Sequence, residues 1–321
     1  MTTDNLDDPG AYAAWSARHR PSADARAGRR AAALAHVARW REPLRAAILR
    51  THRLVVPDGL FAYWGFARSL DPDARAALHE IGVAPGGLLE VFEALLAVDA
   101  DPARLSTLGG LDVRLESRYY RDPAELFTFA YGNTDGLHYG LWFDDLRTAP
   151  QGIGSCYAHA GGEIVLDRMS PLDLVRDEAE QYQEVMREGT TVAEVEEPEF
   201  RDLLRFRADV LLEDLAAWAV AGGGSADDDP GLAPDEPRLP TADGAGAFAD
   251  GAAVEPGNPA EALCRGRDIH WVSARNSARE VAARELLVRA YRALGRDALA
   301  EVAELHQANR QLGSVAVLTR G

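Results

Sequence analysis

The spacing of apolar side chains predicts helices in the first third of the chain. Residues 11–50 carry alanine, leucine and isoleucine at intervals of three and four, which predicts an Ala/Arg-rich helical appendage with a thin apolar stripe. A second helix, with bulky aromatic residues on its apolar face, is predicted from Asp58 until Pro72, because proline cannot continue a helix from within. A third helix is predicted over residues 88–96, after a Pro-Gly-Gly breaker.

In the middle of the chain the period changes to two, which is the period of a half-buried strand. The predicted strands cover residues 113–120, 126–131, 137–143, 154–157 and 163–166. The loop at residues 132–136 is rich in residues that tolerate positive φ. Residues 126–143 are therefore predicted to form an antiparallel hairpin within a larger sheet.

The last third returns to helical periodicity. Helices are predicted over residues 171–188 and 199–220, and a longer helical pattern runs from 273 to 311, where Gly295 is a possible break. Between them, residues 222–259 are dense in Gly, Ala, Asp and Pro and predict a long, partly mobile loop.

The order of these elements predicts an α+β fold, with helices flanking a central antiparallel sheet and a C-terminal helical domain after it. The predicted units are an N-terminal helical appendage (1–52), the sheet domain (53–170) and a mostly helical domain (171–321).

Composition narrows the functional classes. The chain has 321 residues, 47% of them hydrophobic, and a net charge of −17, which argues against binding to a nucleic-acid backbone. No apolar run is long enough to span a membrane, and the stretch from Met1 to Pro9 does not resemble a signal peptide, so we expect a cytoplasmic protein. Cys156 and Cys264 are expected to be buried thiols, since two cysteines cannot form a cysteine-based zinc site. No metal site is predicted.

Three stretches of the chain carry a resemblance to a known family. The first is Val56-Pro57-Asp58-Gly59-Leu60-Phe61-Ala62-Tyr63-Trp64, and the second runs from Tyr119-Tyr120-Arg121-Asp122-Pro123 through His138-Tyr139-Gly140 to Asp145. The third is Gly266-Arg267-Asp268 with the helical pattern of residues 286–310. In this order and spacing they resemble the histone PARylation factor family, although Ala124 stands where the family usually has a second proline.

The resemblance implies a noncatalytic accessory protein that binds an ADP-ribosyltransferase and completes its active site. In the family, a C-terminal glutamate acts as base for a serine hydroxyl that attacks NAD, and a nearby arginine anchors the partner. By position, Glu255 corresponds to the glutamate and Arg238 to the arginine, while Asp268 and His270 are further candidates for partner binding. The chain itself is expected to bind no cofactor, because NAD would be held by the partner.

Other interpretations remain open. Asp250 and Glu261 compete with Glu255 as the carboxylate, and the proline-led aromatic helix also resembles immunity proteins of the Smi1/Knr4 superfamily, which act by contact alone. An enzyme in its own right is not expected, since no convergent set of polar groups is apparent. His138 lies between apolar residues of a predicted strand and is expected to be a buried, hydrogen-bonded histidine.

Overall fold

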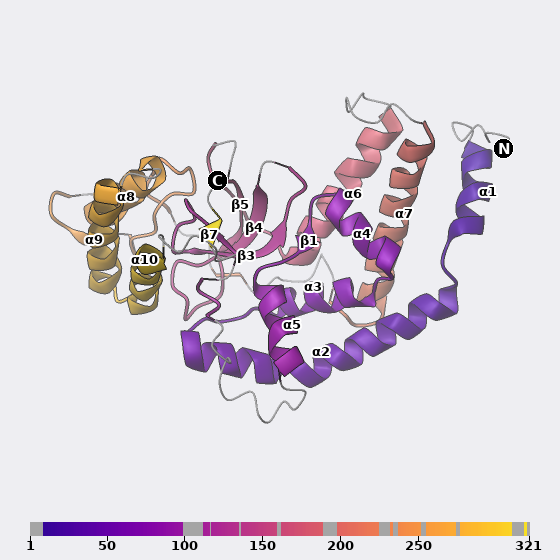
Figure 1. The fold of residues 1–321 in the computed structure, drawn as a ribbon, viewed down its shortest axis with the longest axis horizontal. Helices are drawn as coiled ribbons and strands as arrows, with labels where there is room; N and C mark the ends of the chain where they lie inside the picture. Colours follow the sequence, from indigo (N-terminus) through magenta and orange to yellow (C-terminus); the bar gives the residue numbers. More distant parts are fainter. Residues whose placement is uncertain are drawn as a thin grey trace.

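A computed structural model describes most of the chain. The described residues are 9–98, 112–115, 117–134, 136–158, 162–188, 198–224, 232–233, 237–251, 255–273, 277–309 and 318–319. They form an α+β fold in which an antiparallel sheet lies between two groups of helices, as Figure 1 shows. The fold class predicted from the sequence is confirmed.

The central sheet has five strands in the order β1-β3-β4-β5-β6, and every neighbouring pair is antiparallel. The strands are β1 (Ala84–Pro85), β3 (Leu126–Tyr131), β4 (Leu137–Trp142), β5 (Gly152–Tyr157) and β6 (Val165–Asp167). Leu126 pairs with Trp142 at the open end of the β3–β4 hairpin, and the register shifts between Thr128 and Ala130. The predicted hairpin is confirmed.

The N-terminal helices surround an aromatic core. They are α1 (Pro9–His19), α2 (Ala23–His52), α3 (Asp58–Ser69), α4 (Pro72–Glu80) and α5 (Leu88–Val98). Phe61 stacks on Phe92 at 5.3 Å between ring centroids, and Trp64 meets the same ring edge-on at 5.5 Å. The predicted helix at Asp58 is confirmed, and its regularly spaced aromatic residues form this core.

The remaining helices lie on opposite sides of the sheet (Figure 1). Helices α6 (Pro171–Glu188) and α7 (Pro198–Val220) pack against each other near α3 and α4. Helices α8 (Pro259–Val272), α9 (Ser277–Ala293) and α10 (Asp297–Asn309) form a second group. Gly295 has a φ of +72° and separates α9 from α10, as predicted.

Two sequence predictions need correction. The described residues of 113–120 do not form one continuous strand. Leu115 N–H donates to the Asp112 carbonyl in a turn, Ser117 has a φ of 52°, and of these described residues only β2 (Arg118–Tyr119) is a strand. It pairs in parallel with β7 (Leu318–Thr319). Helix α8 follows directly after the region predicted as a loop and was not recognised, although Asn258 caps it by accepting from Glu261 N–H.

The end of α2 at His52 and the start of α6 at Pro171 coincide with the predicted unit boundaries, and the division itself stays a prediction. Within the predicted loop, residues 237–251 form a compact turn closed by a bridge between Leu239 and Ala247. None of the described helices combines the length and the hydrophobicity that crossing a bilayer requires.

Candidate functional site

The candidate site lies on α8 and the turns that precede it, and a buried charged network fixes this helix to the sheet domain. The Arg267 side chain is 1% exposed. Its Nε donates to Asp243 at 2.6 Å, and its Nη1 donates to Glu125 at 3.0 Å. Tyr291 of α9 donates to the same Glu125 oxygen at 2.7 Å, and the guanidinium lies 4.9 Å from the centre of the Trp142 ring. Arg267, the two carboxylates and the Tyr291 hydroxyl therefore join α8, α9, the 237–251 turn and the start of β3.

The pKa values in this network follow from burial and pairing. Burial tends to raise the pKa of Asp243, but the charge of Arg267 and hydrogen bonds from Thr241, Arg267 and Ala245 N–H outweigh it, so the pKa lies below its usual value. Burial raises the pKa of Tyr291 well above normal, which keeps its hydroxyl protonated as a donor. The network is thus charged at Arg267 and Asp243 at neutral pH.

The three consecutive residues Gly266, Arg267 and Asp268 each have a different structural role. A side chain at Gly266 would approach Leu287 of α9 to within 2.9 Å, so the glycine allows α8 and α9 to pack closely. Arg267 forms the buried network, and Asp268 accepts from Ala242 N–H at 2.6 Å. Together they fix the position of α8 relative to α9 and the 237–251 turn.

Arg238 is held by a carboxylate of this chain. Both terminal nitrogens of its guanidinium donate to Asp144, Nη1 at 3.0 Å to each carboxylate oxygen, and its Nε donates to the Ala245 carbonyl at 3.1 Å. Burial raises the pKa of Asp144 against the opposing charge of Arg238, and burial lowers the pKa of the guanidinium. No sequence pattern indicated Asp144 as the partner of Arg238. A direct contact of Arg238 with another protein stays a prediction.

His270 connects α8 to the turn before β3. Its Nε2 lies 3.1 Å from the Arg121 carbonyl and 3.2 Å from the Asp122 carbonyl, so Nε2 carries the proton and donates. His270 and Asp268 therefore brace the two sides of α8. Their contact with a partner is untested and stays a prediction.

Glu255 lies on the exposed turn in front of α8. Its carbonyl accepts from Asn258 N–H at 3.1 Å, which closes the turn just before the helix cap. On the other side, Arg296 donates to the Phe248 carbonyl at 2.6 Å and to the Asp250 carboxylate at 2.9 Å. Among the described residues, the Phe248 and Glu255 carbonyls therefore both accept hydrogen bonds that fix the backbone.

The three acids near this turn differ in what they contact. Asp250 is paired with Arg296, and Glu261 accepts from Gly257 N–H at 2.6 Å. The Glu255 carboxylate has no hydrogen-bond or ion-pair partner among the residues that the structure describes. Asp250 and Glu255 are both exposed, but of the three acids only Glu255 lacks a partner within the described part of the chain.

Comparison with known proteins adds to this geometry. No family model matches the chain. The chain is similar to Histone PARylation factor 1 of Danio rerio. The two are 28% identical over 126 residues, which is 38% of this chain and 34% of that protein. The resemblance predicted from the sequence is confirmed, and the match spans about a third of the relative's length.

Proposed function

We propose that this protein is an accessory factor that binds an ADP-ribosyltransferase and completes the active site of its partner with the Glu255 carboxylate. The observation that carries the proposal is the exposed carboxylate of Glu255, which has no partner among the described residues and lies on a turn closed by the Asn258 N–H. The similarity to Histone PARylation factor 1 supports the same kind of partner.

In this proposal the partner binds NAD and this chain supplies one base. An exposed carboxylate is a weak base until its surroundings change. When a partner covers the turn, water leaves the carboxylate, and its basicity rises within hydrogen-bond reach of a serine hydroxyl. Glu255 then takes the hydroxyl proton, the serine oxygen bonds to the ribose carbon of NAD, and the bond from that carbon to nicotinamide breaks.

Arg238, Asp268 and His270 are proposed to lie at the margin of the contact. Because Asp144 and Ala245 already bind the guanidinium of Arg238, a partner carboxylate would have to share it. A bidentate arginine pair has the geometry for such sharing.

The test compares serine modification by the cognate transferase in the presence of wild-type protein and of Glu255→Gln, which removes the basic oxygen but keeps the shape. We expect a loss of about 10²–10⁴-fold in the rate of serine modification, the usual contribution of a general base. Affinity for the transferase should change by less than about tenfold. Glu285→Ala, which removes an exposed acid on α9, is the matched control and should leave the rate unchanged.

Equal modification rates with wild type and Glu255→Gln would reject the catalytic role. That result would favour a second candidate function, a binding module of the Smi1/Knr4 kind. The net charge of −17 favours that reading only for a basic partner, since opposite charge steers association. For such a module, the affinity for a basic partner would fall steeply with added salt.

A further inference from the structure

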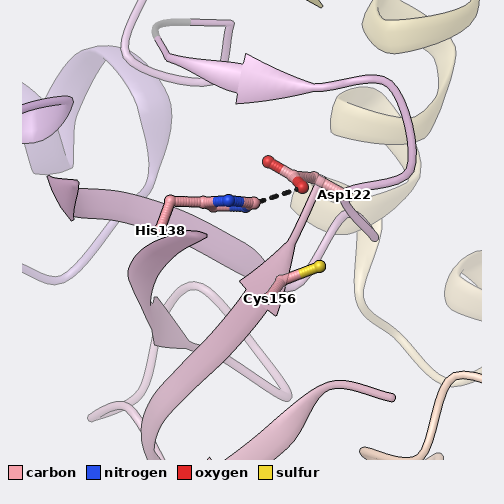
Figure 2. A group of neighbouring side chains, drawn as sticks. All are labelled: Asp122, His138 and Cys156. Carbon is pink, nitrogen blue, oxygen red and sulfur yellow. Dashed lines mark hydrogen bonds and ion pairs between the residues drawn. The ribbon is translucent and has the colours of Figure 1, made fainter. Parts of the chain in front are cut away.

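Three different ligand-type side chains meet inside the sheet, away from the Glu255 turn. Asp122 follows β2, His138 lies on β4, and Cys156 lies on β5 directly opposite His138 in the strand register. Their ligand atoms all lie within 4.8 Å of one another. Figure 2 shows the His138 ring pointing at Asp122, with Cys156 on the adjacent strand beside them.

The cluster is closed to solvent. The side chains of His138 and Asp122 are 0% exposed, and Cys156 is 2% exposed as a residue. The expectation that His138 is buried and hydrogen-bonded is confirmed, and Cys156 is a free, buried thiol as predicted. What the sequence did not reveal is that the two residues converge with Asp122.

The surrounding hydrogen bonds orient two of the three residues. His138 Nδ1 lies 2.9 Å from the Gly136 carbonyl, so this nitrogen donates and Nε2 faces Asp122 Oδ1 at 3.0 Å. The other oxygen of Asp122 accepts from Tyr119 N–H at 2.8 Å. In metal sites, a ligating histidine commonly donates its second ring nitrogen to a backbone carbonyl, and a ligating carboxylate is hydrogen-bonded in turn. Both features are present here.

We propose that Asp122, His138 and Cys156 bind a divalent metal ion of the zinc class. One thiolate sulfur, one imidazole nitrogen and one carboxylate oxygen are the donor types that zinc accepts in proteins. Two negative ligands and a doubly positive ion sum to zero, which suits a site removed from water. Binding would release the Cys156 thiol proton and the proton shared between His138 and Asp122.

Such an ion would stabilise the platform that carries the candidate site. It would connect the turn before β3 to β4 and β5, and His270 of α8 donates to the carbonyls of the same turn. The inference does not depend on the role proposed for Glu255, because the metal can be measured on the chain alone.

The test compares metal binding after replacement of each of the two cysteines, Cys156 in the cluster and Cys264 outside it. The full-length protein is purified and also refolded with Zn²⁺ or Co²⁺, since a buried cluster can require metal during folding. We expect about one bound ion per chain after removal of free metal, and a thiolate-to-cobalt charge-transfer absorption in the Co²⁺ form. Cys156→Ser should lose this absorption, and Cys264→Ser, the matched control, should retain it.

Two further variants keep the result interpretable if Cys156→Ser does not fold. His138→Gln and Asp122→Asn should each lower metal affinity at least about tenfold while far-ultraviolet circular dichroism confirms the fold. Absence of bound metal in both native and refolded wild-type protein would overturn the proposal. A cobalt–thiolate absorption that survives in Cys156→Ser, or that disappears in Cys264→Ser, would also overturn the proposal. The cluster would then be a His138–Asp122 pair beside an inert thiol.

Discussion

The two sides of the molecule are held together by different interactions. Around α3 and α5 the core is aromatic, with Phe61, Trp64 and Phe92 packed ring to ring. Around α8 the residue that joins the elements is a charged one, because Arg267 reaches both Glu125 and Asp243 inside the protein. Apolar packing tolerates small shifts of a helix, whereas a buried arginine with two specific acceptors has few equivalent positions.

This difference bears on how the exposed carboxylate that we propose as a base would be positioned. The Glu255 turn leads directly into α8, and α8 is held by Arg267, Asp268 and His270. We infer that the charged side of the molecule specifies the orientation of the turn and the aromatic side supplies stability.

The largest effect is expected from Arg267→Ala. It leaves the carboxylates of Glu125 and Asp243 buried and without their shared cation, and breaking a buried pair in this way costs about 3–5 kcal/mol. Urea denaturation should show a correspondingly lower midpoint. Arg289→Ala, an exposed arginine on α9, should change the free energy of unfolding by less than about 0.5 kcal/mol.

Phe92→Ala should cost a similar amount, about 3–5 kcal/mol, because it removes a fully buried ring from the aromatic core. The contrast with Arg267 lies in the pH dependence. The pKa of Asp243 is lowered in the folded protein, so its contribution to stability is present above its unfolded pKa and is lost as the pH falls through its folded pKa. The cost of Arg267→Ala should therefore shrink in acid, and the cost of Phe92→Ala should stay constant between neutral pH and pH about 4. A parallel decline of both costs would contradict the division.

The aromatic side could be predicted from the sequence and the charged side could not. Tyr63, Trp64 and their neighbours repeat at helical spacing, and two short apolar runs flank a loop that contains Gly132 and Gly136, so the local pattern was sufficient to predict the helix and the β3–β4 hairpin. Arg267 and Glu125 are 142 positions apart, and no periodicity connects residues at that separation. The same holds for Arg238 with Asp144 and for the meeting of Asp122, His138 and Cys156.

The strand prediction for residues 113–120 was wrong because of local hydrogen bonding. Residues 113–120 alternate as a strand does, but the Asp112 side chain accepts from both the backbone and the side chain of Arg114, which favours a turn. Arg118 then turns inward and donates to the carbonyls of Pro123 and Ala124. Its hydrogen bonds are satisfied by turn carbonyls, which a pattern of polar and apolar letters does not reveal.

A smaller effect is expected from Arg238→Ala, about 1–3 kcal/mol, because the Asp144 carboxylate loses its partner while remaining mostly buried. The Trp142 indole still donates to it at 3.3 Å, which limits the loss. Thermal unfolding measures the cost. If Arg238 also anchors a partner, affinity for the transferase should fall together with stability, whereas Asp144→Asn should lower stability and leave the guanidinium in place for the partner. If Arg238→Ala and Asp144→Asn bind the transferase with equal affinity, Arg238 is not part of the contact with the partner.

The smallest change in stability, about 1 kcal/mol, is expected from Asn258→Ala, which removes the cap of α8. Asn258 also closes the turn, since its N–H donates to the Glu255 carbonyl, and the alanine keeps this backbone donor. The cap loss alone should therefore loosen the first turn of α8 and lower the serine-modification rate more than it lowers affinity for the transferase. Asn258→Asp, which can still accept from Glu261 N–H, should restore both stability and rate. A modification rate that is unchanged in Asn258→Ala would mean that the position of Glu255 does not depend on the start of α8, and the link between the charged side of the molecule and the proposed chemistry would be lost.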